Sequence, residues 1–451
     1  MRRNWVPPPL RCVMQSNFLL MLAGGLSLFQ SPQVQAQTFK VLHAFRGSPD
    51  GNHPSAGLTV DHSGSIYGTT FVGGASYYGT AFKLRPGTKE RVLYSFDARY
   101  GAHPDTTLVR DVKGMLYGAT LYGGDYRSGT VFKLDKNYNE TVLHTFHEPA
   151  EGYWPNALIG DGQGNLYGTT EEGGNSTCNY GEGCGVVFKL DKGKKETVLH
   201  AFVGGTDGAQ PSGGLVRDTL GNLYGTTYFG GDLISCPPFG CGTVFKIDPN
   251  GTETILYSFT GAGGDGSNPS GSIVLDENGT LYGATATGGG AGCPGFQGEC
   301  GTVFKLDASG AETVLYRFTG TNGDGRDPEG GVVMDAAGNL YGTTRNGGNT
   351  GCYTGCGTAF RLGVTGDETV LHRFSGGWDG ALPSAGLALD ASGKLYGVAQ
   401  YGGDPHCRGG GGCGTVFVVT VVSGLQIGFR ATAQIPEQGS SQSSSELASV
   451  P

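Results

Sequence analysis

The chain has 451 residues, of which 85 are glycine, and only 15% of the residues are charged. The glycines follow no G-X-Y period, which excludes collagen, and 22 Phe with 21 Tyr give more aromatic surface than disordered chains carry. The net charge of -9 argues against nucleic acid and anionic membrane surfaces as partners, and the composition favours an all-β protein.

The first 36 residues are typical of a secretory signal peptide. Arg2, Arg3 and Arg11 precede an apolar stretch at 18–29, which is too short to cross a bilayer as a stable anchor. We expect cleavage after Ala36, with an uncleaved membrane anchor as the alternative. Loss of these three arginines from the 30 basic residues would change the net charge from -9 to -12. The mature chain would then be exported, to the periplasm or the extracellular space, with no membrane span.

Between residues 37 and 428 one unit is repeated seven times. Each unit has an (L/I)-Y-G motif, with an Asp six residues and a Gly three residues before the Tyr. A Gly pair, a G-[TV]-[AV]-F segment and a [VI]-L-[HY]-x-F segment recur in register with it. The motif tyrosines are Tyr67, Tyr117, Tyr167, Tyr224, Tyr282, Tyr341 and Tyr396. A period of this length is typical of propellers and solenoids.

Each unit contains four short strand candidates. In the fifth unit they are 272–275, 280–285, 302–306 and 312–318, and tight Asp/Gly turns join the first pair and the last pair into hairpins. We therefore predict a seven-bladed β-propeller of four-stranded up-and-down blades, with an open β-solenoid as the alternative.

The two ends of the repeat region predict how the ring closes. The mature chain begins at 39–45 with a single [VI]-L-[HY]-x-F segment, which is the fourth strand of the other units. The last unit has only its first three strands. The N-terminal strand could complete the last blade, although 418–427 competes for the same position. Beyond the repeats, 429–451 is rich in Ser and Gln and is predicted to be a disordered tail.

Ten of the 11 cysteines occur as pairs within the loop between the second and third strands of five units. This pattern predicts one disulfide per loop, formed in an oxidising compartment. Zinc is the disfavoured alternative, because each loop has two Cys and no recurring His. The predicted pairs are Cys178 with Cys184, Cys236 with Cys241, Cys293 with Cys300, Cys352 with Cys356, and Cys407 with Cys413.

The motifs also resemble a known repeat. Residues 218–227 read D-T-L-G-N-L-Y-G-T-T, and together with G-G, G-T-V-F-K-L-D and E-T-V-L-Y-S-F the unit resembles the GloVer tandem repeat of exported bacterial proteins. The resemblance covers about 38–419. It implies export and a propeller-like array, and it implies no established reaction.

We expect function on one rim of the ring. In up-and-down blades, the loops between the second and third strands share a rim with those that lead from one blade to the next. We call this the long-loop rim, and binding residues concentrate in such loops. Aromatic rings there could stack on sugars, so the candidate ligand-binding residues are His53, His103, Trp154 and Trp378.

The loops between blades also carry a series of Asp residues. A ring of acids could bind Ca²⁺, which prefers oxygen ligands. Asp-Gly is also a turn signature, and we favour that interpretation. No other cofactor is indicated. The candidate metal ligands are Asp50, Asp207, Asp265, Asp324 and Asp379.

No catalytic motif occurs in the chain, so the sequence favours a non-enzymatic binding or scaffold module for glycan or protein. The alternative is a hydrolase or lyase that acts on an extracellular glycan or lactone. An enzyme should break the sevenfold pattern where unlike polar groups converge. The third unit breaks it most, at Asn156, Glu171 and Glu172.

Overall fold

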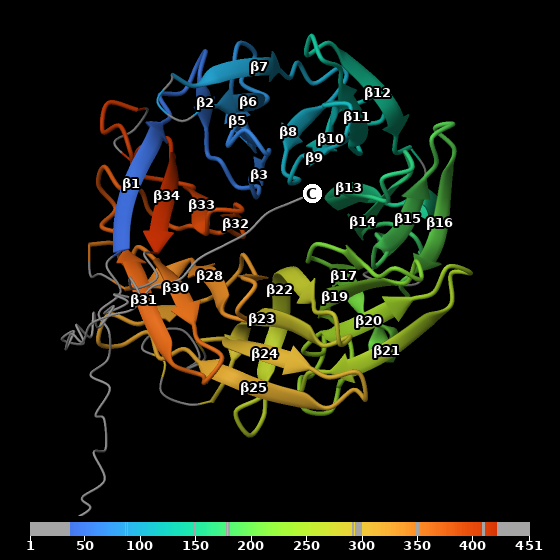
Figure 1. The fold of residues 1–451 in the computed structure, drawn as a ribbon. Helices are drawn as coiled ribbons and strands as arrows, with labels where there is room; N and C mark the ends of the chain where they lie inside the picture. The colour runs from blue at the N-terminus through green and yellow to red at the C-terminus, as the bar shows by residue number, and fades with distance from the viewer. Residues whose placement is uncertain are drawn as a thin grey trace, which may run out of the picture. The chain divides into compact units, whose positions relative to one another are not determined.

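The computed structural model describes residues 37–85, 87, 89–147, 149–176, 178, 181–290, 293, 300–348, 351–407 and 411–421. The predicted signal peptide at 1–36 and the predicted tail at 429–451 lie outside these residues. The described residues form a closed ring of seven antiparallel sheets of four or five strands, with two further two-stranded sheets (Figure 1). The predicted seven-bladed propeller is therefore confirmed, and the open solenoid is wrong.

In blades 1 to 6 the innermost strand at the channel comes first in the chain and the outermost strand comes last, whereas in blade 7 the outermost strand comes from the N-terminal end of the repeat region. Blade 1 contains β3 (Thr59–Val60), β4 (Ile66–Thr70), β6 (Thr80–Leu84) and β7 (Arg91–Ser95), with β2 (Gly51–Asn52) paired to β5 (Val72–Gly73). Blade 2 contains β8 (Ala102–Pro104), β9 (Val109–Arg110), β10 (Leu116–Tyr122), β11 (Thr130–Leu134) and β12 (Glu140–Thr145). Blade 3 contains β13 (Tyr153–Gly160), β14 (Leu166–Glu172), β15 (Val186–Leu190) and β16 (Glu196–Ala201).

The remaining blades follow the same plan. Blade 4 contains β17 (Ala209–Pro211), β18 (Val216–Arg217), β19 (Leu223–Phe229), β20 (Thr243–Ile247) and β21 (Glu253–Ser258). Blade 5 contains β22 (Gly266–Leu275), β23 (Leu281–Gly288), β24 (Thr302–Leu306) and β25 (Glu312–Arg317). Blade 6 contains β26 (Gly325–Arg326), β27 (Val332–Met334), β28 (Leu340–Thr344), β29 (Asn346–Gly347), β30 (Thr358–Leu362) and β31 (Glu368–Arg373).

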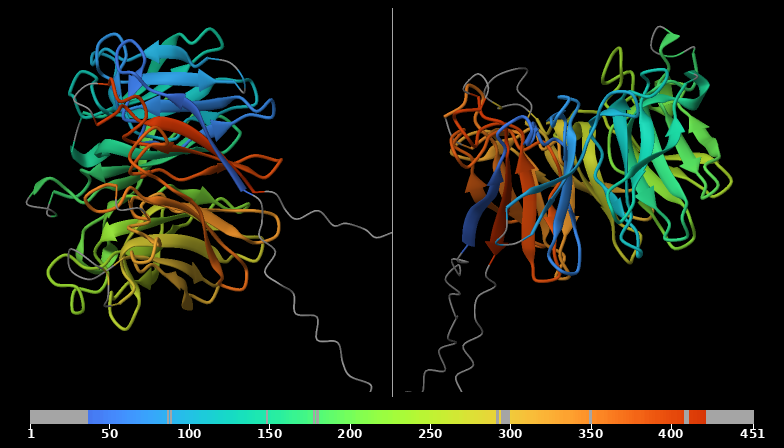
Figure 2. Two further views of the ribbon diagram at one scale, coloured as in Figure 1. Left: turned by 90° about the vertical axis from the view of Figure 1, so that its left-hand side faces the viewer. Right: turned by 90° about the horizontal axis from the view of Figure 1, so that it is seen from above.

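Blade 7 joins the two ends of the repeat region. It contains β32 (Ala388–Leu389), β33 (Lys394–Ala399), β34 (Thr415–Val421) and the N-terminal strand β1 (Gln37–Ala44). Strand β1 pairs antiparallel with β34, and the two lie side by side in Figures 1 and 2. Val418 to Val421 extend the third strand, so the competing assignment of 418–427 as the closing strand is wrong within the described residues.

One repeated set of contacts fills the space between neighbouring blades. The Phe that ends each outermost segment meets the Phe of the next blade's third strand edge-on, as Phe259 meets Phe304 at 5.1 Å between ring centroids. In the second strand a Gly faces this ring; a Cβ at Gly283 would stand 2.7 Å from Phe304 Cζ. The [VI]-L-[HY]-x-F and Y-G motifs thus build the interblade core.

The regular spacing of Asp and Tyr within the unit has a local cause. The carboxylate of Asp218 accepts N–H groups from Leu220 and Asn222, which closes the turn between β18 and β19. Its other oxygen accepts the hydroxyl of Tyr224 at 3.1 Å. These short turns form the rim opposite the long-loop rim. Among the described residues no helix is long and apolar enough to cross a membrane.

Candidate binding site at the long-loop end of the central channel

Each blade begins its innermost segment with a residue of positive φ followed by proline. A left-handed backbone is costly for residues other than Gly, so surrounding contacts must hold it. The φ angles lie between 53° and 61°. The seven residues are His53, His103, Trp154, Gln210, Asn268, Asp327 and Leu382.

A hydrogen bond to the preceding blade holds each of these residues. In five blades the acceptor is the carbonyl of the second Cys of a disulfide, at 2.7 to 3.0 Å, as in Asn268 N–H to Cys241 O. In the two blades without a disulfide the acceptors are the carbonyls of Tyr78 and Ser128. The disulfide loops therefore help to fix the backbone at the channel mouth, including across the closure of the ring at His53.

Five disulfides join the ten cysteines of the described loops, each within a single loop. The bridges join Cys178 to Cys184, Cys236 to Cys241, Cys293 to Cys300, Cys352 to Cys356, and Cys407 to Cys413. These are the pairs that the spacing of the cysteines predicts. Disulfides of this number are typical of an oxidising compartment.

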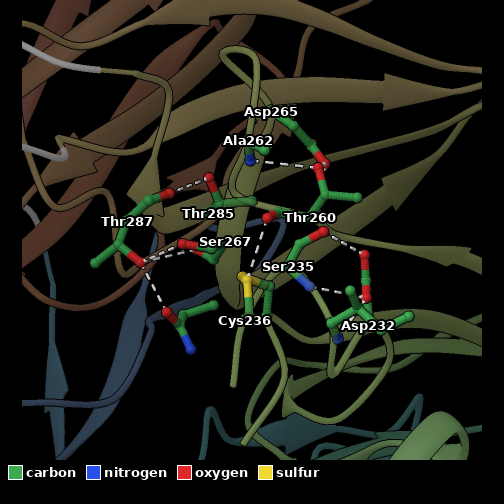
Figure 3. The surroundings of a disulfide bond; sticks show 12 residues. Asp232, Ser235, Cys236, Thr260, Ala262, Asp265, Ser267, Thr285 and Thr287 are labelled. Atoms are coloured by element: carbon green, nitrogen blue, oxygen red, sulfur yellow. Dashed lines mark hydrogen bonds between the residues drawn. A yellow bond between two sulfur atoms is a disulfide. The ribbon is translucent and has the colours of Figure 1, made fainter. Parts of the chain in front are cut away.

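The bridges also contact the chain that enters the next blade. Figure 3 shows the surroundings of the bridge at Cys236, whose Sγ lies 3.2 Å from the carbonyl oxygen of Thr260. Thr260 in turn donates its hydroxyl to Asp265 at 2.8 Å. This bridge thus packs against the loop that carries the chain into blade 5.

The residues after the prolines line a cavity of about 560 Å³ on the ring axis. These seven positions come from all seven blades and are polar throughout. They are Ser55, Asp105, Asn156, Ser212, Ser270, Glu329 and Ser384. Unlike groups at one symmetric position can orient a ligand, whereas a uniform ring cannot.

One carboxyl, that of Asp105, lines the cavity from blade 2, and Glu171 of blade 3 is close enough to influence it. Asp105 accepts a hydrogen bond from the Ser55 hydroxyl, and burial raises the pKa of Asp105 to about 6, with a contribution from the charge of Glu171. Burial also raises the pKa of Glu171. Within the described part of the chain, neither carboxyl has a basic partner.

The opposite side of the cavity holds an ion pair within blade 6. Arg345 Nη1 donates to Glu329 Oε1 at 3.0 Å and to Oε2 at 3.3 Å. Tyr228 lines the cavity nearby, and its pKa is raised by burial and by the charges of Glu329 and Asp327. Glu329 is therefore compensated by a basic partner, in contrast to Asp105 and Glu171.

Aromatic side chains of blades 1 to 3 form a continuous band, and two of them, His103 and Trp154, lie two residues before the cavity-lining Asp105 and Asn156. We call it the aromatic arc; its members are Phe71, His103, Tyr122, Trp154 and Tyr153. Neighbouring ring centroids along it are 4.7, 5.7, 5.9 and 5.5 Å apart. The pairing of Tyr153 with Glu172 and of Pro155 with Thr170 sets Trp154 opposite Glu171. Trp154 and Glu171 are therefore cross-strand neighbours.

The structure places the four predicted ligand-binding residues in different surroundings. His103 and Trp154 belong to the aromatic arc, and His53 occupies the equivalent position in blade 1, 4.7 Å from the Tyr401 ring. Trp378 is 64% exposed and has no ring contact among the described residues. The sequence analysis did not identify Asp105, Glu329 or Arg345 as site residues. A Pro recurs directly before the first two in the repeat, and this spacing was the signal that could have identified them.

The five predicted metal ligands lie on the outer side of the ring, between blades. Each accepts backbone N–H groups of its own loop and contacts the His or Tyr of the adjoining outer strand, as His372 contacts Asp379 at 3.0 Å. A Glu of the next blade completes the groups His43–Asp50–Glu90 and His200–Asp207–Glu253, whose ligand atoms lie within 4.8 Å of one another. Calcium binding by these acids stays a prediction.

Comparison with known proteins identifies the repeat. The chain matches the model of the Gloeobacter/Verrucomicrobia repeat at residues 27–235, 141–296 and 235–445, and it belongs to this family. The predicted GloVer resemblance is thereby confirmed. No curated protein matches the chain at a significant level.

Solved structures show the same fold at low sequence identity. Virginiamycin B lyase from Staphylococcus aureus matches with a TM-score of 0.54 and 14% identity over 85% of this chain and 100% of its own. An extracellular domain assigned to a one-component system of B. thetaiotaomicron matches with a TM-score of 0.52 and 10% identity, over 84% of this chain and 40% of its own. These similarities concern the fold alone.

Proposed function

We propose that this member of the Gloeobacter/Verrucomicrobia repeat family is an exported, non-enzymatic module that binds glycan at the long-loop end of its central channel. The proposal rests on the aromatic arc of blades 1 to 3 together with the polar cavity. Rings such as Trp154 and Tyr122 offer flat apolar faces for sugar rings, and Asp105 and Asn156 offer hydrogen bonds for hydroxyl groups.

The supporting framework is rigid. Hydrogen bonds from each blade to its neighbour, and disulfides in five of the loops, hold the mouth before any ligand arrives. Such preorganisation reduces the entropy lost on binding. Export is part of this proposal, since the five disulfides and the predicted signal peptide both support an oxidising destination.

A glycan array followed by calorimetry on the mature protein tests the proposal. Trp154→Ala should weaken binding about tenfold, because it removes one stacking face. Trp378→Ala is the matched control: it removes an indole from the same rim but away from the arc, and it should leave affinity unchanged. Equal loss in both variants, or no binding on the array, would contradict the proposal.

A hydrolase or lyase that acts on an extracellular glycan or lactone is the second candidate, because unlike side chains break the sevenfold repeat at the cavity. Product analysis separates the two functions. If bound oligosaccharide is consumed and Glu171→Gln abolishes turnover while binding persists, the enzymatic function replaces the binding one.

A further inference from the structure

We propose that two of the seven outer seams, where the outermost strands of neighbouring blades face each other, bind a divalent transition metal between one imidazole and two carboxylates. The inference is independent of the glycan function, because these seams lie on the outer side of the ring and contribute nothing to the lining of the channel cavity. The two groups are His43–Asp50–Glu90, between blades 7 and 1, and His200–Asp207–Glu253, between blades 3 and 4.

The donor atoms of each group lie close enough together to share one ion. Nε2 of His43 lies 3.2 Å from Oδ2 of Asp50, and Nε2 of His200 lies 3.2 Å from Oδ1 of Asp207. Two donors on a tetrahedral zinc ion, each about 2.0 to 2.2 Å from the metal, stand about 3.3 to 3.5 Å apart. In each group a carboxylate oxygen of the next blade lies within 4.8 Å of both atoms, so its Glu can supply the third ligand and water the fourth.

The donor set selects the kind of metal. Imidazole nitrogen is a ligand for zinc and its neighbours in the transition series, whereas calcium takes oxygen ligands. Each group also brings two carboxylates together, and a dication removes the repulsion between them. These two seams therefore favour a transition metal, although the Asp residues alone suggest calcium.

Unused acceptor atoms at the same places are a second indication. Oε1 of Glu90 and Oε1 of Glu253 are each buried without a hydrogen-bond partner among the described residues. Buried carboxylate oxygens are normally satisfied by protein, water or a cation. Asp50 is meanwhile held by the backbone N–H groups of Arg46 and Gly51, at 3.1 and 2.9 Å, and such outer contacts orient a metal ligand.

The other seams show what takes the place of a ligand. The Glu acceptor recurs in most of them, but in three the imidazole is replaced by a Tyr whose hydroxyl donates to an acid of the seam, as Tyr257 donates to Asp265 at 3.2 Å. Between blades 6 and 7 the Glu is replaced by Phe39, which stacks on His372 at 3.6 Å between ring centroids. The seam between blades 2 and 3 has a Glu in place of the Asp, 3.6 Å from the imidazole, and we assign no metal to it. The blade thus accepts Tyr at the His position, which makes His→Tyr a suitable test.

One of the two sites spans the closure of the ring. His43 belongs to β1, the N-terminal strand that completes blade 7, and Glu90 directly precedes β7 of blade 1. An ion shared by these residues ties the closing strand to the neighbouring blade. Metal binding should therefore stabilise the closed propeller.

The test is zinc binding by the untagged mature protein, after treatment with a chelator, measured by equilibrium dialysis and metal analysis. His43→Tyr and His200→Tyr should each bind one zinc ion fewer than the wild type, and the double variant two fewer, because each change removes the nitrogen ligand. His372→Tyr is the matched control: its seam lacks the Glu, so it should bind as much zinc as the wild type.

Thermal melting gives a second readout and also verifies that each variant folds. Zinc at about 100 times its dissociation constant should raise the melting temperature of the wild type by about 3 °C for each site, and it should give no such rise in the double variant. Glu90→Gln and Glu253→Gln remove the third ligand instead, and they take the place of a Tyr variant that fails to fold.

Three results would overturn the inference. They are an unchanged number of bound zinc ions when either ligand His is replaced, an equal loss in His372→Tyr, and displacement of zinc by an equal concentration of calcium. Since no sugar enters these measurements, such a result would leave the glycan function standing.

Discussion

The outer seams between blades make a prediction about pH that can be worked out in detail. Glu312 begins β25, and its Oε1 is buried without a hydrogen-bond partner among the described residues. Burial, assisted by the nearby charge of Asp265, raises the pKa of Glu312 from 4.5 to about 7, while Arg317 opposes the rise. Five further glutamates occupy the same position in other blades, and the pKa of each is raised mainly by burial: Glu90, Glu140, Glu196, Glu253 and Glu368.

The sign follows from linkage. A carboxyl whose pKa is higher in the folded chain takes up a proton on folding, so its stabilising contribution is complete below pH 4.5 and is lost as the pH rises through 7. For a fully buried carboxyl, a pKa shift from 4.5 to about 7 would change the free energy of unfolding by about 3.4 kcal/mol between low and high pH. Because Glu312 is only half-buried, solvent screening reduces the figure to about 1 kcal/mol.

Replacement of Glu312 by Gln tests this reasoning, because the amide mimics the protonated acid at every pH. Urea unfolding at pH 5 and pH 8.5 should show that the wild-type protein loses about 1 kcal/mol more stability than Glu312→Gln over this interval. The control is Glu277→Gln, which changes an exposed residue of a short turn and should behave as wild type. Identical pH dependence in Glu312→Gln and wild type would refute the assignment.

Three further predictions concern the architecture. Deletion of residues 37–46 removes β1 from blade 7, so unfolding should become less cooperative and aggregation should increase; unchanged thermal melting would contradict closure by this strand. Alkylation of the exported protein should add no label before reduction and ten afterwards, counted by mass spectrometry, and any label without reductant would contradict the pairing. Gly225→Ala should cost about 1 to 3 kcal/mol in urea unfolding, because its Cβ would stand 2.6 Å from Phe245 Cζ, whereas Gly411→Ala, with open space around it, should be nearly neutral.

The fold could be predicted from the sequence because the residues that form the turns and the interblade contacts recur at the same positions in every repeat. The Asp of each short turn binds backbone N–H groups within four residues, and the Phe and Gly of each unit meet the same partners in every seam. The lengths of the strands were predicted less well. Strand β22 begins at Gly266 rather than near 272, because the segment after the interblade loop also pairs with β23. Such pairing depends on the neighbouring strand and leaves no period-2 pattern.

The candidate site could be predicted only in part. The alignment of the repeats predicts the long-loop rim and the presence of His103 and Trp154 on it. The assembly of the aromatic rings into one arc could not be predicted, because it depends on contacts between different blades. Asp105 and Asn156 lie 51 positions apart in the sequence and line one cavity only because the ring brings adjacent blades to one axis. The ion pair of Glu329 with Arg345 likewise depends on two segments that meet at the cavity.

A crystal structure of the mature protein with a bound oligosaccharide, chosen from the glycan array, tests the proposed binding site most directly. We expect sugar density at the long-loop end of the channel, with one ring stacked on Trp154 and a sugar hydroxyl within hydrogen-bond distance of Asp105 or Asn156. Sugar bound at the outer seams or at the short-turn rim, with the channel mouth empty, would contradict it.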